Sequence, residues 1–201
     1  MRLDHLVISA ATLDEGCDWV EAHLGVRPAG GGRHVHMGTH NRLLGMGNLY
    51  LEVIAIDPAG ETPAQPRWFA LDDFSGLPRL TNWVVAVENL RAELAQAPAG
   101  AGEPWALSRG DLRWHVGVPL DGRLPFDGGF PLLIHWDTPL HPTAQLADSQ
   151  IRLTRLEIDH PRAGALRPAL ADLHDPRVAV IEGPAPRLRA EFATPGGPVW
   201  L

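Results

Sequence analysis

The sequence of this 201-residue chain predicts an α+β protein whose sheets are mainly antiparallel. Three observations support this prediction. A strand, a helix and further strands follow one another three times, in repeats of roughly fifty to eighty residues. Several strands follow each helix, which is not the order of a doubly wound parallel sheet. Hydrophobic residues make up 45% of the chain and charged residues 20%, the usual composition of a globular core.

The first repeat opens with a strand at residues 3–10, where polar and apolar residues alternate. The alternation places Leu3 and His5 on one face and Asp4 and Leu6 on the other. One of the two faces is therefore expected to meet a core.

A helix is expected next. Thr12 is a suitable N-cap, Glu15 stands at the spacing of a capping box, and Gly25 is a suitable C-cap. The repeat then continues with a glycine-rich turn at 30–32, a segment at 34–46 and a strand at 49–56.

The second and third repeats follow the same plan. The second has expected strands at 80–87, 112–120 and 132–136, and a short helix that Asn89 can cap. The third has an expected strand at 151–158, a helix at 164–173, and strands at 178–181 and 188–192. Polar or proline-rich connectors at 58–66 and 139–149 mark the seams.

Charge and cysteine content exclude several classes of protein. The formal net charge is −7, and the basic residues are scattered arginines, which argues against nucleic acid or an anionic membrane surface as a partner. Cys17 is the only cysteine, so neither an intrachain disulfide nor a multi-thiolate zinc site can form. No segment has the pattern of a signal peptide or a membrane span. We therefore expect a cytoplasmic protein whose partner is a small molecule.

His5 and Glu52 are the candidate catalytic residues. A lone strand histidine is more often structural than functional. Glu52, however, lies in an apolar strand, where an ionised carboxylate is costly unless it is paired, hydrated or bound to metal. If Leu51 and Val53 face the helix, Glu52 faces the same side as His5. The alternative is a Glu52 on a solvated sheet face.

His135 repeats this anomaly in the apolar strand at 132–136. Two histidines and a carboxylate can form a facial triad that leaves positions open on a divalent cation such as Zn, Ni, Mn or Fe. Such a cation could polarise a carbonyl or activate water. Because His5, Glu52 and His135 come from well-separated strands, the metal site stays a hypothesis.

The segment at 30–41 is the densest local signal. Its histidines are spaced like a metal tract, although glycine-rich loops also collect polar residues. Glycine lets the backbone approach a ligand closely, and Thr39 and Asn41 offer short hydrogen-bonding side chains. We interpret His34, Thr39 and Asn41 as ligand-binding residues of a loop.

Three tryptophans, Trp83, Trp114 and Trp136, each lie in an expected strand. Each could belong to the core or to a pocket wall, since indoles supply much of the apolar area in small-molecule sites. We include all three as candidate substrate-binding residues.

Taken in order, these motifs resemble the glyoxalase-like domain of the vicinal oxygen chelate superfamily. The matching segments are Leu3–Val7, Gly31–Asn41, Tyr50–Val53, Leu112–Trp114 and Phe130–Trp136. The resemblance implies paired βαβββ modules that form a cupped sheet around one site. It implies a domain at 1–140 with modules at 1–57 and 80–137, and a C-terminal βαββ-like extension at 150–201 packed on the same unit.

The resemblance also implies a ligand set. In metal-binding members, four ligands come from the first and last strands of each module, and by position these fall on His5, Glu52, Trp83 and His135. An indole has no lone pair to offer a metal, so Trp83 departs from the pattern. A three-ligand site of His5, Glu52 and His135 is what the resemblance leaves.

Two functions stay open at this point. The first is an enzyme (a lyase, isomerase or dioxygenase) that uses a divalent cation held by His5, Glu52 and His135, with Glu52 as a metal ligand or the general base. The second is a metal-free enzyme or a metal-free protein that binds or sequesters a small molecule, as the resistance proteins of the superfamily do. The fold does not choose between them. The modules could pair within one chain or across a homodimer.

Overall fold

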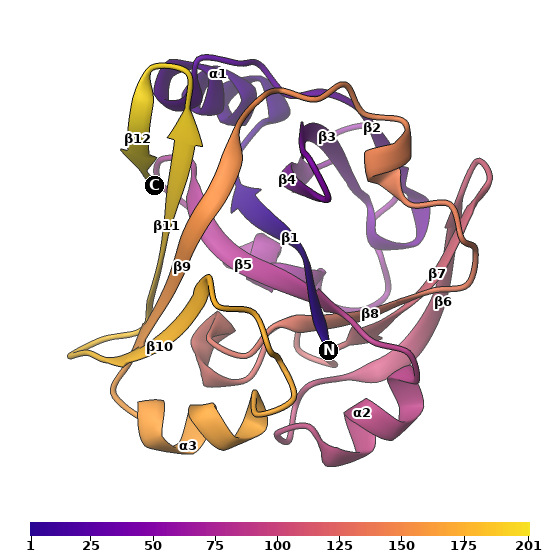
Figure 1. The fold of residues 1–201 in the computed structure, drawn as a ribbon. Helices are drawn as coiled ribbons and strands as arrows, with labels where there is room; N and C mark the ends of the chain where they lie inside the picture. The colour runs from indigo at the N-terminus through magenta and orange to yellow at the C-terminus, as the bar shows by residue number, and fades with distance from the viewer.

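The computed structural model describes residues 1–201 and contains an eight-stranded and a four-stranded sheet (Figure 1). The first module comprises β1 (Arg2–Ser9), α1 (Leu13–Leu24), β2 (Ala29–His34), β3 (Thr39–Met46) and β4 (Leu49–Ile56). The second comprises β5 (Arg79–Ala86), α2 (Leu90–Gln96), β6 (Glu103–Arg109), β7 (Leu112–Val118) and β8 (Leu132–Trp136). The third comprises β9 (Arg152–His160), α3 (Ala163–Ala169), β10 (Val178–Glu182), β11 (Arg187–Thr194) and β12 (Gly197–Trp200). The predicted α+β class is confirmed.

The first two modules share one curled sheet with the strand order β2-β3-β4-β1-β5-β8-β7-β6. In each module the first strand pairs in parallel with the last, and β1 and β5 join the modules as an antiparallel pair. The sheet curls far enough for its two edge strands, β2 and β6, to contact each other. This curl produces the predicted cup. None of the helices combines the length and hydrophobicity required to cross a membrane.

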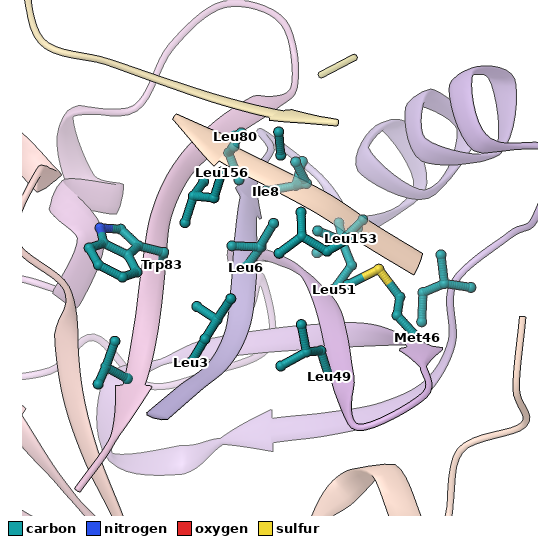
Figure 2. Packing of buried hydrophobic residues seen from close by; sticks show 14 of the residues in the cluster. Leu3, Leu6, Ile8, Met46, Leu49, Leu51, Leu80, Trp83, Leu153 and Leu156 are labelled. Atoms are coloured by element: carbon teal, nitrogen blue, oxygen red, sulfur yellow. The ribbon is translucent and has the colours of Figure 1, made fainter. Parts of the chain in front are cut away.

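The two faces of the curled sheet bury separate hydrophobic clusters. The outer face is covered by α1 and by the third module, and Leu153 and Leu156 of β9 lie beside Leu6 and Ile8 of β1 (Figure 2). The predicted capping of α1 is confirmed, since Thr12 Oγ1 accepts the backbone N–H of Glu15 at 3.2 Å. The inner face carries a second cluster and the polar residues described below.

The third module has a different strand order from the first two. Its sheet runs β10-β9-β11-β12, so the strand after α3 returns directly beside the first strand. The structure adds β12 to the expected βαββ pattern and ends α3 at Ala169, before the predicted boundary at residue 173. Pro168 stands in the last turn of α3, where it cannot donate a backbone hydrogen bond to the carbonyl of Gly164 and so weakens the helix. The division of the chain at residue 140 stays a prediction.

Two expectations about the first module are wrong. The glycine run at 30–32 is not a turn but part of edge strand β2, and Thr39 and Asn41 lie on strand β3 instead of in a loop. The strands pair with a register shift between Ala29 and Gly32. A Cβ on Gly31 would lie far inside the contact distance of the Asn41 carbonyl oxygen, so glycine is what lets β2 approach β3 there.

A β-bulge in β1 overturns the simple alternation of its side chains. The pairing with β5 shifts between Leu3 and His5, which leaves Asp4 as the extra residue. The alternation predicted that Leu3 shares a face with His5, but Leu3 is instead buried in the outer cluster. The bulge brings the carboxylate of Asp4 beside the ring of His5.

We expect Gly31→Ala to lower the free energy of unfolding by about 2 kcal/mol more than Gly30→Ala. Both glycines have positive φ, +88° and +72°, so both variants carry the strain of a left-handed alanine. Only at Gly31 would the new methyl group also displace backbone, because the nearest atom to a Cβ at Gly30 is a Leu146 side-chain carbon 3.6 Å away. Urea unfolding of both variants measures the difference, and equal destabilisation would contradict the proposed close approach.

Candidate functional site

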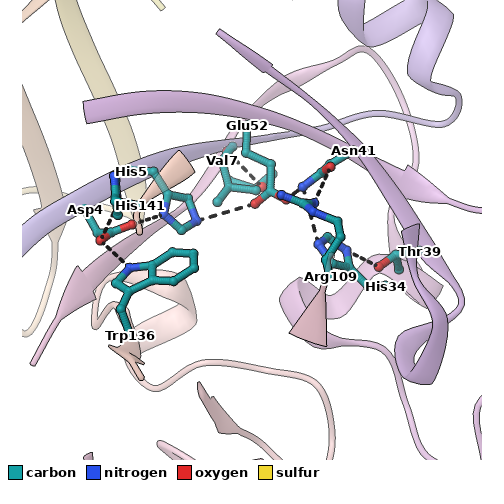
Figure 3. Close-up of polar contacts among 11 residues, drawn as sticks. Asp4, His5, Val7, His34, Thr39, Asn41, Glu52, Arg109, Trp136 and His141 are labelled. Atoms are coloured by element: carbon teal, nitrogen blue, oxygen red, sulfur yellow. Dashed lines mark hydrogen bonds and ion pairs between the residues drawn. The ribbon is translucent and has the colours of Figure 1, made fainter. Parts of the chain in front are cut away.

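A continuous chain of polar side chains, buried except for the half-buried Arg109, crosses the inner face of the curled sheet (Figure 3). Asp4 Oδ1 lies 2.6 Å from His5 Nδ1, and His5 Nε2 lies 3.5 Å from Glu52 Oε2. Glu52 Oε1 accepts a 2.6 Å hydrogen bond from Asn41 Nδ2. Arg109 Nη1 donates to Asn41 Oδ1 at 3.1 Å. We call these five residues the polar chain.

The strand register explains why these side chains meet. β1 and β4 are parallel neighbours, and Val7 stands opposite Glu52, two residues from His5. β3 is antiparallel to β4, and Leu43 stands opposite Glu52, two residues from Asn41. Glu52 is therefore a diagonal neighbour of both His5 and Asn41 on the same sheet face. The structure thus brings Glu52 and His5 to one side, with Leu51 and Val53 in the outer cluster.

His5 is protonated at neutral pH because it lies between two carboxylates. Burial alone would lower the pKa of His5, but the hydrogen bonds to Asp4 and Glu52 raise it to about 9. Burial alone would raise the pKa of Glu52, but the contact with His5 lowers it to about 2. The pKa of Asp4 also falls below its ordinary range, because hydrogen bonds from His141 and His5 outweigh burial. With Arg109, the formal charges of the polar chain sum to zero.

Further hydrogen bonds hold Asp4 at one end of the polar chain. Its Oδ2 accepts the indole N–H of Trp136 at 3.0 Å and lies 3.2 Å from His141 Nε2 (Figure 3). The ring of His5 stacks on Tyr50 with centroids 4.3 Å apart. The position of the imidazolium is therefore fixed by an ion pair on each nitrogen and by a stacked ring.

His34, Thr39 and Asn41 form a second hydrogen-bonded group beside Glu52. His34 Nδ1 lies 3.0 Å from Thr39 Oγ1, and Asn41 Nδ2 lies 3.3 Å from His34 Nε2. Burial lowers the pKa of His34 to about 4, so the ring is neutral and its Nε2 can accept from the amide. The histidine tract does not act as a unit, because His36 is exposed and His40 lies near Asp57.

The polar chain borders a small cavity, about 40 Å³ in volume, whose remaining walls are mostly apolar. Strands β5, β7 and β8 supply six of these wall residues: Val84, Trp114, Val116, Leu132, Ile134 and Trp136. Trp68 and Phe69 come from the short 3₁₀ helix at Trp68–Asp73. Trp114 and Trp136, two of the candidate ligand-binding residues, thus line the cavity.

The structure corrects two of the expected site residues. Trp83 is fully buried on the opposite face of β5, where its indole N–H donates to the Gly129 carbonyl oxygen at 3.1 Å. His135 points away from the cavity, with Nδ1 3.0 Å from the Val87 carbonyl oxygen. The reason is the alternation of the strands: Val84 on β5 and Ile134 on β8 take the inner positions beside them.

The donor set does not fit the metal centre that the resemblance implied. His5 and Glu52 supply two donors, and the inner positions of the second module carry apolar side chains. No group of three histidine, cysteine or acidic side chains in residues 1–201 is arranged to hold a metal ion. The expected three-ligand set of His5, Glu52 and His135 is therefore not assembled, because His135 faces the other side of the sheet.

Sequence reasoning missed several residues of the site, chiefly Asp4, Arg109, Tyr50 and His141. Asp4 is next to His5 in sequence, but only a bulge brings the two side chains together. Arg109 ends β6, a strand that the pattern did not reveal. His141 lies in a connector and has no sequence signal that relates it to Asp4.

The chain is similar to known proteins in both sequence and fold. A sequence model of the glyoxalase-like domain matches residues 3–174. The crystal structure of a hypothetical protein from Staphylococcus aureus aligns with TM-score 0.65 and 14% identity, over 92% of this chain and 88% of that chain. Because this coverage exceeds the first two modules, the shared fold extends into the third. No functionally curated protein matches the chain.

Methylmalonyl-CoA epimerases align more weakly. The enzyme from Mycobacterium tuberculosis has TM-score 0.44 and 21% identity over 71% of this chain and 91% of that chain. A complex of the Streptomyces coelicolor enzyme with 2-nitronate-propionyl-CoA has TM-score 0.44 and 14% identity over 70% and 99%. Scores this low carry no argument about the reaction of this chain.

The free energy of unfolding is expected to peak near pH 6.5. The pKa of His5 is about 9 in the folded chain and 6.5 ordinarily, so its stabilisation is complete below pH 6.5 and is lost as the pH rises through 9. The loss amounts to about 3 kcal/mol. The pKa of His34 is about 4, so the unfolded chain alone takes up this proton, and stability falls as the pH drops from 6.5 through 4.

Urea unfolding at a series of pH values measures both effects. His5→Gln should flatten the profile between pH 7 and 9, and His34→Gln should flatten it between pH 6.5 and 4. An unchanged alkaline slope in His5→Gln would show that His5 is not held as an imidazolium.

Proposed function

The chain belongs to the glyoxalase-like domain family, and we propose that it is a metal-independent lyase or isomerase acting on a small carbonyl compound. The observation that carries the proposal is the buried pair of His5 and Glu52, an acid and a base whose reactive atoms lie 3.5 Å apart at the edge of one cavity. Pairs of titratable groups whose pKa values are pushed apart are typical of acid–base catalysis.

In the proposed step, the substrate oxygen faces His5 Nε2 and an adjacent C–H bond faces Glu52. Glu52 takes the proton from carbon, the C–H electron pair forms a C=C bond, and the carbonyl oxygen takes the proton of His5. The products are an enol, a neutral His5 and a protonated Glu52. Return of the proton to the other face or to another carbon gives an isomer, and loss of a β-substituent gives a lyase product.

The electrostatics of the pair support this exchange. A carboxylate with a pKa of about 2 is a weak base at rest, and its contact with the His5 imidazolium is what lowers that pKa. When His5 gives its proton to the substrate oxygen, this cause is removed, and burial then raises the pKa of Glu52. The transfer of a proton from His5 to the substrate oxygen therefore makes Glu52 a better base for the proton on carbon. Asp4 holds Nδ1 of His5 throughout and orients the ring.

The arrangement of donors favours these two reaction classes over a dioxygenase. A facial triad for a redox metal requires two histidines and a carboxylate on one face. Here the second histidine, His135, faces outward, and Val84 and Ile134 occupy the inner positions.

A metal-free binding or sequestering protein is the second candidate, and the apolar second module favours it. Every residue that β5, β7 and β8 contribute to the cavity wall is hydrophobic, including Trp114 and Trp136. Such walls bind an organic ligand without reacting with it.

Solvent deuterium exchange distinguishes the two candidates. In D₂O we expect the chain to replace the α-protons of at least one class in a panel of small ketones, aldehydes and thioesters, followed by proton NMR. His5→Gln and Glu52→Gln should each slow the exchange by about 100-fold or more, the usual contribution of an acid or base. Glu103→Gln, which changes an exposed carboxylate on β6, should leave it unchanged.

The pH profile of the exchange rate should fall above about pH 9, where His5 loses its proton. If compounds bind to the wild type in a thermal-shift assay but none exchanges, the enzyme proposal fails and the binding protein is supported.

Metal analysis tests the metal-independent part of the proposal. Protein purified without chelator is expected to hold only sub-stoichiometric metal, and adding Zn, Ni, Mn or Fe should shift the melting temperature of wild type and His5→Gln equally, because neither assembles a third donor. A stoichiometric metal that is lost in His5→Gln but retained in His135→Gln would contradict it.

A further inference from the structure

Near the inner cavity lies a second and larger groove. The groove has a volume of about 380 Å³ and lies between β2, the β6–β7 turn and the connector at 139–149. Arg109 lines both hollows. The inner cavity, at about 40 Å³, is far smaller than the groove and has room for only a few water molecules, since one water needs about 10–15 Å³ of such space. An organic ligand larger than the inner cavity could occupy the groove and still reach Arg109.

The guanidinium of Arg109 lines the inner cavity and forms no ion pair with a carboxylate. Its one hydrogen bond is to the neutral Asn41 Oδ1, at 3.1 Å, although a guanidinium has five N–H donors. Its aliphatic stem lies over Gly32, where a Cβ would come within 2.6 Å of Arg109 Cδ. The glycine at position 32 therefore permits this placement, and the remaining donors are available to a ligand.

We propose that Arg109 binds the carboxylate of a short oxo acid in this groove and so directs the carbonyl group of the ligand to the His5–Glu52 pair. This inference rests on the proposed function, since it names the substrate class of the same site. Arginine suits the role because its planar fork matches a carboxylate with two parallel hydrogen bonds. Asn41 alone stands between Arg109 and Glu52, which favours a ligand whose two groups are only a few bonds apart.

The charges of the site favour a monoanion. The four ionised residues of the polar chain sum to zero, so one carboxylate adds a single negative charge beside the guanidinium. A dianion such as a phosphate monoester would add two, and Asp111 in the groove wall would repel it further. The ligand chemistry is therefore a monocarboxylate.

Arg109 can turn toward a ligand without disturbing the catalytic pair. If its hydrogen bond to Asn41 is released, Asn41 Oδ1 still accepts the backbone N–H of Gly32 at 2.8 Å. The amide keeps its orientation, and its Nδ2 continues to donate to Glu52 at 2.6 Å. The turn of Arg109 would join the cavity to the groove and admit the carbonyl end of the ligand.

Calorimetric titration of levulinate and pyruvate, each against its uncharged methyl ester, tests the proposal. We expect wild type to bind at least one acid about tenfold or more tightly than its ester, as a charge-assisted hydrogen bond predicts. Arg109→Gln should abolish this preference, and Arg109→Lys should retain part of it because the charge remains without the fork. Arg91→Gln, an exposed arginine on α2, is the matched control and should keep the full preference.

Gly32→Ala provides a variant that keeps the arginine. The added methyl group should push the flexible stem of Arg109 out of place and reduce the preference for the acid, with a melting temperature close to that of the wild type. No preference of wild type for either acid, or a preference that survives in Arg109→Gln, would overturn the proposal. Tighter binding of inorganic phosphate than of levulinate would overturn the monoanion assignment.

The outcomes also separate this inference from the proposed function. An Arg109-dependent preference for the acid without deuterium exchange would support the carboxylate site and reject the enzyme. Exchange without any preference for the acid would support the enzyme and reject the carboxylate site.

Discussion

The site depends on one arrangement of charges, an imidazolium buried between two carboxylates. Any of the three groups alone would be costly at this depth, since an unpaired buried charge loses its hydration. Asp4 and Glu52 stabilise His5 from opposite sides of the ring, and each carboxylate has further donors, Trp136 and His141 on one and Asn41 on the other. Removing one partner would leave the charges of the others uncompensated. The bulge that places Asp4, the strand register that places Glu52 and the connector that carries His141 therefore all serve to keep His5 paired.

The two modules are similar in fold and different in chemistry. The first contributes four of the five residues of the polar chain, and only Arg109 comes from the second. The second contributes apolar walls at the positions that face His5 and Glu52 across the cavity. A ligand in this cup would therefore be oriented by its own polarity, with its reactive polar end toward the first module and its hydrocarbon part against the tryptophans.

Much of the fold could be predicted from the sequence, and much less of the site. With Leu51 and Val53 assigned to the side of the helix, the apolar strand predicted the face that Glu52 shares with His5, because a regular strand fixes which side chains point the same way. Trp83 and His135 lie on the strands where the sequence predicted them, but their side chains face away from the cavity. A shift of one residue along a strand is enough to move a side chain to the other side of a sheet. Asp4 escaped prediction because a bulge breaks the alternation, and His141 because its contact with Asp4 spans 137 positions.

The interactions that stabilise the polar chain also restrain its reactivity. While His5 keeps its proton, Glu52 is a poor base, and while Arg109 lies over Asn41, the cavity stays too small for an organic ligand. A ligand that engages Arg109 with a carboxylate and His5 with an oxygen would relieve both restraints together. A ligand that lacks the oxygen would bind against the apolar walls and leave Glu52 at its low pKa. On this view, turnover or sequestration is decided by whether an acceptor oxygen reaches His5 Nε2, so both behaviours can arise from one site according to the ligand.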